Sequence, residues 1–439
     1  MELASAPTLP SFTAAPIAGR RIFPLSRRKA LISLTMTALL AIGVFLRVNP
    51  SAGYQKLGTD EHGYMVFVKQ IETAGLSNYD AVVQVYLQRQ AKLREAVVPA
   101  TRVGFLVPAT ICAEVFQLRV FTALHATAAA AGILLLLLSA LFAYRLGGTL
   151  PMLGVTALMA TSPLDVYLCQ RAMIDGYFAF WALAALWLAW ENLQRPRSAG
   201  WLVAYALCLT VLVLTKETAA FVVLAIFGIF LANRLLHVGT ITPQLLAATI
   251  IGPAVAALIL VVMIGGVGET ILFYEMFVAK SRSSFYSVAA QDGPWYRYAI
   301  DFALVSPAIV AFAVGGIFQL RRFDRAGLYV ATFVGLTLAS MSCVRYGLSL
   351  RYAAFCDMPL AWLACGQILT LSRRAVRVRP TIIAIGIFSI VAVIGFNQYA
   401  RIFVKGGLYD PITEQLVLTL KMAKSATTVR AQLAAPAGH

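Results

Sequence analysis

Long runs of apolar residues, each close to the length that crosses a lipid bilayer, follow one another along most of the chain. About 20 residues of helix, at about 1.5 Å each, span a hydrocarbon core of about 30 Å. Turn-forming or charged residues separate neighbouring runs, as at Gly147-Gly148, Pro196 and Pro380. The pattern predicts an all-α polytopic membrane protein with about eleven transmembrane helices. These lie at approximately 30–48, 121–144, 150–168, 172–190, 200–215, 218–236, 243–266, 299–320, 327–344, 350–371 and 381–397.

The composition supports a membrane protein and excludes two other classes. Of the 439 residues, 60% are hydrophobic and 13% are charged, against about a quarter charged in soluble domains. This excludes a soluble enzyme and a disordered scaffold. The formal charge of +17 comes from residues spread between the apolar runs, so it indicates membrane topology and not a nucleic-acid partner. The six cysteines form no CxxC pair, which argues against a disulfide framework or a zinc site.

The basic residues alternate between successive loops, which gives an orientation. With the N-terminus in the cytoplasm, every short inner loop has a basic excess, as the positive-inside rule requires. Residues 1–29 are then expected to form a disordered cytoplasmic tail, 30–397 the transmembrane domain, and 398–439 a short extracytoplasmic tail. The first apolar run is interpreted as a retained helix, because no clear cleavage site follows it. The inner loops contain Arg145, Arg195, Arg197, Arg234, Arg321, Arg322, Arg325, Arg373, Arg374, Arg377 and Arg379, with only Glu191 and Asp324 as acids.

Two long segments face outward in this orientation, 49–120 and 267–298. The first mixes apolar and polar positions over 81–93, and again over 61–74, as expected for helices lying in the membrane interface. In the second, the segment 295–298 (Trp-Tyr-Arg-Tyr) is interpreted as an interfacial aromatic belt, with a sugar-stacking platform as the alternative. Because most acidic residues also fall on the outer side, we expect extracytoplasmic chemistry at a site built from loops and helix ends.

The adjacent carboxylates Asp60 and Glu61, just beyond the first helix, are the strongest catalytic candidates. Asp60 could accept a proton from an incoming nucleophile, and Glu61 could orient Asp60 or share a divalent metal ion with it. The structural alternative is a helix start, with Thr59 or Asp60 as the N-cap and Glu61 near the positive end of the helix dipole. The two roles are compatible.

Several short motifs resemble the GT-C membrane glycosyltransferases, in particular the branch of protein O-mannosyltransferases and the lipid A aminoarabinose transferase. That family has an Asp-Glu pair with a Tyr three residues later directly after its first helix, and Asp60, Glu61 and Tyr64 match this pattern. Three later stretches are similar to further landmarks, although Ala100 replaces a proline that is common in the family. They are Pro99–Phe105, then Ser162-Pro163 with Arg171 and Asp175, and finally Arg351-Tyr352.

Cations on the outer side are candidates for binding a phosphate. Arg171 and Asp175 lie four residues apart, so on one helix they could pair with each other or hold a phosphate together. Lys216 and Glu217 occupy a short turn where the family has a similar Lys; the alternative is an exposed pair worth little energetically. Two more arginines, Arg345 and Arg351, have no acid close in sequence and need an anion, either a carrier phosphate or a phospholipid headgroup.

The resemblance implies a glycosyltransferase that takes a sugar from a polyprenyl-phosphate donor at the outer face of the membrane. Asp60 would be the general base of an inverting transfer to a lipid, glycan or protein acceptor. Some of Arg102, Arg171, Lys216, Arg345 and Arg351 would stabilise the phosphate, with Tyr64, Asp175, Glu217 and Tyr352 in support. No cofactor is required beyond the candidate metal ion, and a bacterial inner membrane is the expected location. The alternative is a transporter or flippase, for which Asp301 and Asp357 are the main mid-span charges.

Overall fold

The computed structural model describes residues 25–50, 57–320, 324–344, 347–374 and 379–405, and every regular element in these ranges is a helix. The chain first forms α1 (Leu25–Val48), α2 (Thr59–Ala74), α3 (Tyr79–Lys92), α4 (Val103–Phe116), α5 (Val120–Gly147), α6 (Thr149–Ala160), α7 (Pro163–Cys169), α8 (Ile174–Gln194) and α9 (Ala199–Thr215). It continues with α10 (Ala219–Leu236), α11 (Pro243–Ile264), α12 (Val267–Ser283), α13 (Phe285–Ala290), α14 (Arg297–Val305), α15 (Pro307–Phe318), α16 (Arg325–Ser342), the 3₁₀ helix η3 (Leu350–Cys356), α17 (Asp357–Arg374) and α18 (Pro380–Tyr399).

The helices confirm the polytopic membrane class. In the described ranges, six helical segments are long and apolar enough to cross a membrane, or seven if α6 and α7 count as one broken span. Each of the eleven predicted runs is helical. Two runs are broken, one by a 60° bend between α6 and α7, the other at Ser306 between α14 and α15. Eleven crossings and their orientation stay a prediction.

Both breaks occur at a Ser-Pro pair. Pro163 and Pro307 each occupy the first turn of the following helix, where the missing N–H costs nothing. The residue before a proline is pushed away from helical geometry, and Ser162 and Ser306 both have non-helical dihedral angles. The short helix α7 thereby places its polar N-terminus inside the bundle.

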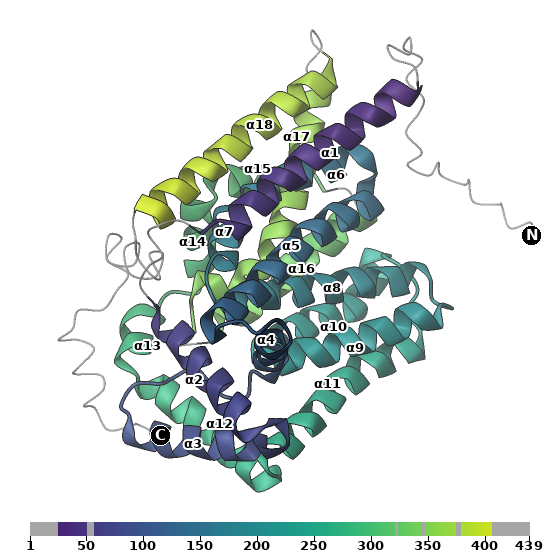
Figure 1. Ribbon diagram of the computed structural model, residues 1–439. Helices are drawn as coiled ribbons and strands as arrows, with labels where there is room; N and C mark the ends of the chain where they lie inside the picture. The colour runs from purple at the N-terminus through teal and green to yellow at the C-terminus, as the bar shows by residue number, and fades with distance from the viewer. Residues whose placement is uncertain (1–24, 51–56, 321–323, 345–346, 375–378, 406–439) are drawn as a thin grey trace, which may run out of the picture.

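Three amphipathic helices gather at one end of the bundle, where α2 and α3 pack together and α12 packs on α3 (Figure 1). Helices α2 and α3 correspond to the predicted interfacial segments 61–74 and 81–93. Gln84 on α3 donates a hydrogen bond to Glu269 on α12 over 2.9 Å, and Tyr86 stacks on Phe273 with ring centroids 4.9 Å apart. The apolar helix α4 was not predicted within segment 49–120; it is short and contains Pro108.

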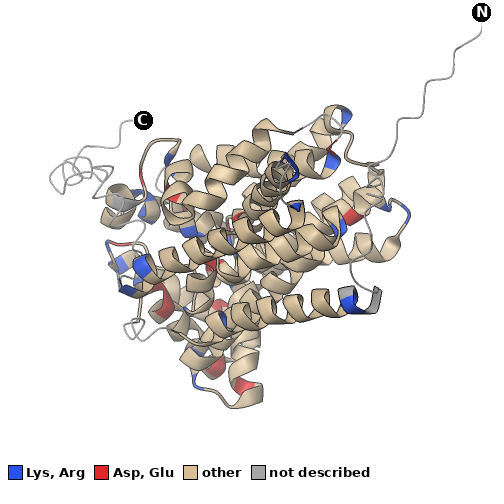
Figure 2. Cartoon of the chain, turned by 90° about the horizontal axis from the view of Figure 1, so that it is seen from above, with Lys and Arg blue, Asp and Glu red and all other residues tan. Residues whose placement is uncertain are grey.

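Charged residues lie mostly toward the ends of the long helices (Figure 2). At one end of α8, the buried Glu191 accepts two hydrogen bonds from Arg145 on α5, over 2.7 and 2.9 Å. At the other end of α8 lies Asp175, about 24 Å away at 1.5 Å per residue. The site described next is built around that second end.

Candidate functional site

A cavity of about 1280 Å³ opens where α2, η3 and the turn between α9 and α10 meet. Segments 95–102 and 277–287, from the two predicted outer loops, complete its wall. Six of the predicted site residues line this cavity, although they come from distant parts of the chain. They are Asp60, Arg102, Lys216, Glu217, Arg351 and Tyr352.

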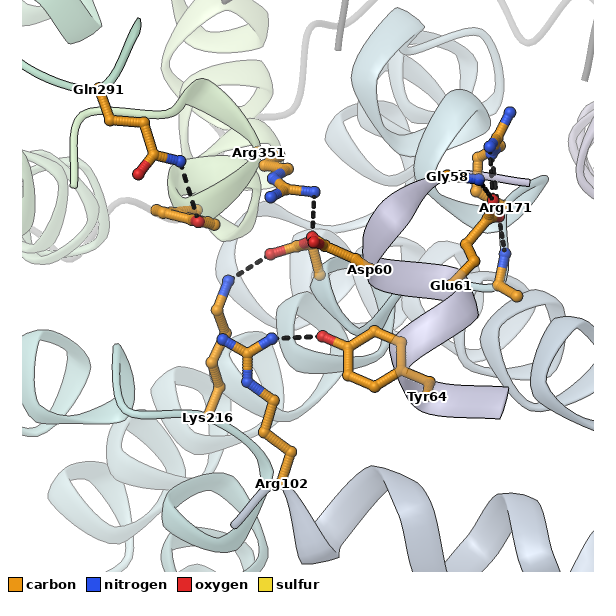
Figure 3. Close-up of polar contacts among 12 residues, drawn as sticks. Gly58, Asp60, Glu61, Tyr64, Arg102, Arg171, Lys216, Gln291 and Arg351 are labelled. Carbon is orange, nitrogen blue, oxygen red and sulfur yellow. Dashed lines mark hydrogen bonds and ion pairs between the residues drawn. The ribbon is translucent and has the colours of Figure 1, made fainter. Parts of the chain in front are cut away.

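Asp60 and Glu61 leave the start of α2 on different sides (Figure 3). Gly58 is the N-cap of α2, and its backbone N–H donates to Glu61 Oε2 over 2.7 Å, which is one of the two hydrogen bonds of a capping box. The prediction of Thr59 or Asp60 as the N-cap is therefore wrong. The Asp60 side chain does not cap the helix. It points to Arg351, with Oδ2 2.7 Å from Nη1, and is 21% exposed at the cavity.

Glu61 is held away from the cavity by a buried ion pair with Arg171. Arg171 Nε donates to Glu61 Oε1 over 2.9 Å, and the backbone N–H of Ala172 donates to the same oxygen over 2.9 Å. Helix α8 begins only at Ile174, so Arg171 and Asp175 do not share one helix face. They pair with Glu61 and Lys216 instead of with each other. Neither Glu61 nor Arg171 lines the cavity.

The geometry does not fit a metal ion shared by Asp60 and Glu61. Both oxygens of Glu61 already accept hydrogen bonds from Arg171 and backbone N–H groups, and Asp60 points to another side of the helix. Among the described residues, no three His, Cys, Asp or Glu side chains group together as metal ligands.

Two cations share the ring of Tyr352. The Lys216 Nζ lies 3.8 Å from the ring centroid and the Arg351 Cζ lies 5.2 Å from it, within the range of cation–π attraction. Lys216 also pairs with the buried Asp175, and Gln291 from the second outer segment donates to the Tyr352 hydroxyl over 3.2 Å. Burial lowers the pKa of Lys216 to about 8, against the opposing effect of Asp175.

Arg102 lies against Tyr64 and Glu217 on another wall of the cavity. It donates to the Tyr64 hydroxyl and pairs with Glu217 over 3.4 Å. Burial raises the pKa of Tyr64 far above its ordinary value, so Tyr64 remains a neutral partner of the guanidinium. Glu217 is about one quarter exposed and is a second carboxylate available to a ligand in the cavity.

A second, mostly apolar pocket of about 500 Å³ lies beside the first. Its wall comes from α9, α10, α11 and α12, with residues such as Val223, Leu260 and Tyr274. Lys216 and Glu217 line both pockets. A chamber with several charged side chains and an apolar groove thus meet at this pair, an arrangement that suits an amphipathic ligand with a charged head.

Some predicted residues lie elsewhere, and some site residues were not predicted. Arg345 lies outside the described residues. Gln291 and Tyr298 line the cavity, and the Tyr298 hydroxyl donates to the Gly347 carbonyl over 3.0 Å. Of the predicted aromatic belt, Trp295 is 76% exposed whereas Tyr298 is buried. In the sequence, Tyr298 was indicated by the aromatic cluster 295–298. The pattern of this cluster does not distinguish a residue of the interfacial belt from a residue that lines the cavity.

Solved structures with this arrangement of helices are membrane glycosyltransferases. The chain matches ArnT from Cupriavidus metallidurans in the apo state with a TM-score of 0.54 and 14% identity, over 88% of this chain and 78% of that one. It matches the oligosaccharyltransferase AglB from Archaeoglobus fulgidus, in complex with an inhibitory peptide and a dolichol-phosphate, with a TM-score of 0.55 and 14% identity, over 87% of this chain and 56% of that one. The chain has the GT-C fold.

A further structure shows the same fold. The oligosaccharyltransferase of Archaeoglobus fulgidus tethered with an acceptor peptide gives a TM-score of 0.57 at 13% identity, over 85% of this chain and 55% of that one. The chain thus spans little more than half the length of the oligosaccharyltransferases. No protein-family model matches the sequence, and no curated protein matches it significantly.

Proposed function

We propose that this protein is a glycosyltransferase that moves a sugar from a polyprenyl-phosphate donor to a lipid, glycan or protein acceptor. One observation carries the proposal. A partly exposed carboxylate, Asp60, faces a cavity whose lining includes the cations Arg102, Lys216 and Arg351, directly beside an apolar groove. The GT-C fold supports it, because AglB, which shares the fold, was solved with a dolichol-phosphate.

In this mechanism Asp60 is the general base. It removes the proton from an acceptor hydroxyl, whose oxygen forms a bond to the anomeric carbon as the bond from that carbon to the phosphate oxygen breaks. Attack and departure occur on opposite sides, so the configuration inverts. In the ligand-free protein Arg351 pairs with Asp60; donor binding moves Arg351 toward the phosphate and releases the carboxylate for proton transfer.

The cations stabilise the charge that develops on the leaving phosphate. Lys216 is held at the Tyr352 ring, and Arg102 at Tyr64, before any ligand arrives. Such preorganised charges need little rearrangement during the reaction. Lys216 lies where the charged cavity meets the apolar groove, so we place the phosphate at Lys216 and the polyprenyl tail between α9, α10 and α11.

The membrane side follows from the basic loops. The Arg145–Glu191 pair and Arg195 lie at the end of α8 opposite to Asp175. The positive-inside rule puts that basic end in the cytoplasm, so the cavity faces the outer side of a membrane, which we take to be the bacterial inner membrane.

The base assignment is tested by the variant Asp60→Asn. We expect transfer of radiolabelled sugar from a polyprenyl-phosphate donor to fall by at least about a hundredfold, with unchanged folding as judged by size-exclusion profile and thermal unfolding. Asp80→Asn, an exposed carboxylate on α3, is the matched control and should retain full activity. Full activity of Asp60→Asn would reject Asp60 as the base.

The transporter alternative is tested in the same system. Its two mid-span charges both have partners, since Asp301 pairs with Arg297 over 3.4 Å and Asp357 accepts from Ser162 over 2.7 Å. In proteoliposomes supplied with a membrane extract, a transferase attaches the labelled sugar covalently to an acceptor molecule in that extract. A transporter moves the label across the bilayer and leaves it unattached.

A further inference from the structure

A second group of buried polar residues surrounds the break between α6 and α7. Arg47 near the end of α1 is fully buried. It donates to the carbonyls of Met159 and Ala160 over 2.9 and 3.4 Å, and to Gly43 within its own helix over 3.0 Å. Since the last carbonyls of a helix have no partner within it, Arg47 satisfies the C-terminal end of α6 and compensates its negative dipole.

The start of α7 is hydrogen-bonded to α17. Ser162, its N-cap, donates to Asp357 Oδ2 over 2.7 Å. Asp165, in the first turn of α7, is fully buried and neither of its carboxylate oxygens has a hydrogen-bond partner among the described residues. Asp165 lies close enough to Arg47 and Asp357 to interact with them electrostatically. Arg47, Ser162, Asp165 and Asp357, here called the break cluster, therefore join α1, α7 and α17.

The far end of α7 is fixed as well. Gln170 accepts a hydrogen bond from Tyr399 of α18 over 2.6 Å and donates to the Asn49 carbonyl over 3.2 Å. Both ends of α7 are therefore hydrogen-bonded to other parts of the bundle. Burying the Asp165 carboxyl without a hydrogen-bond partner costs free energy, so its placement at a helix break indicates a role besides stability.

The break cluster is linked directly to the candidate active site. Asp357 is the first residue of α17 and the C-cap of η3, the short helix that carries Arg351 and Tyr352. On the other side of η3, Phe355 packs against Phe178 with ring centroids 5.6 Å apart. The position of Asp357 therefore sets the position of η3, and through it the distance between Arg351 and Asp60.

We propose that Asp357 is a positioning residue: its bond to Ser162, supported by Arg47 and Asp165, holds η3 so that Arg351 meets Asp60 in the cavity. The structural part of this inference is independent of the reaction. Only the catalytic consequence rests on the proposed function.

The structural part is tested by hydrogen–deuterium exchange of the purified full-length protein in detergent. Ser162→Ala removes the bond from one side and Asp357→Ala from the other, and both should increase amide exchange over 350–356 several-fold. Asp357→Asn, whose amide oxygen still accepts from Ser162, should exchange like the wild type. Glu191→Gln, a change in the buried pair at the other end of α8, is the matched control. Unchanged exchange over 350–356 in Ser162→Ala would overturn the proposal.

The catalytic part is tested by a double-mutant cycle with Arg351→Ala. A residue that acts through Arg351 loses its effect when Arg351 is absent, so Ser162→Ala should reduce kcat/KM several-fold in the wild-type background and hardly at all in Arg351→Ala. Equal reductions in both backgrounds would show general destabilisation and reject the positioning role. Absence of transfer by the wild type would reject the proposed function, while the exchange experiment would still decide the role of Asp357.

Discussion

At the scale of single residues, Lys216 is the cation whose charge depends on pH near neutrality. Burial lowers its pKa to about 8, with Asp175 opposing the change and Arg102 adding to it. A phosphate prefers the protonated amine, so binding a phosphate raises this pKa. We expect the affinity for a polyprenyl phosphate to fall about tenfold between pH 7 and pH 9, because protonated Lys216 becomes about ten times rarer.

The matched variant for this prediction is Lys216→Arg, which stays protonated over the whole range. We expect a weaker affinity at pH 7, because a guanidinium packs differently on Tyr352, and no decline toward pH 9. Isothermal titration in detergent at pH 7, 8 and 9 measures both proteins. A decline of the same size in Lys216→Arg would assign the pH dependence to another group.

At the scale of elements, the start of α2 depends on the Glu61–Arg171 pair. Glu61 accepts from the N-cap N–H of α2 and its partner Arg171 precedes α8, so this contact aims Asp60 at the cavity. Arg171→Met leaves a buried carboxylate unpaired, and we expect a loss of about 3–5 kcal/mol in the free energy of unfolding. The double variant Glu61→Met/Arg171→Met should recover much of this loss, because paired apolar side chains remove both buried charges.

Activity should not recover with stability in that double variant. Without Glu61 the backbone N–H of Gly58 loses its acceptor, and the first turn of α2, which includes Asp60, loses its fixed direction. Chemical unfolding in detergent and the transfer assay, run on the same preparations, separate the two effects. Recovery of both would mean that Asp60 is aimed by other contacts.

The same elements show which structural features were predictable from the sequence. The apolar runs predicted helices because length and hydrophobicity are local properties. The Ser-Pro pairs at 162–163 and 306–307 contained the signal for both breaks, and it was outweighed by the apolar residues around them. The pair Glu61–Arg171 joins residues 110 positions apart, and no periodicity in one sequence specifies such a contact. Arg171 was therefore predicted among the phosphate-binding cations, and the structure pairs it with Glu61 outside the cavity.

At the scale of the whole molecule, the orientation in the membrane decides which substrates can reach the cavity. The basic ends of α5 and α8 favour the cytoplasm by the positive-inside rule. Ser283 at the end of α12 is exposed on the cavity side, and Ala199 at the start of α9 is exposed near the basic end. In a cysteine-free background, we expect a membrane-impermeant thiol reagent to label Ser283→Cys in intact spheroplasts, and Ala199→Cys only after permeabilisation. The reverse pattern would place the cavity in the cytoplasm, where nucleotide-activated sugars are available, and would remove the physical reason for a lipid-linked donor.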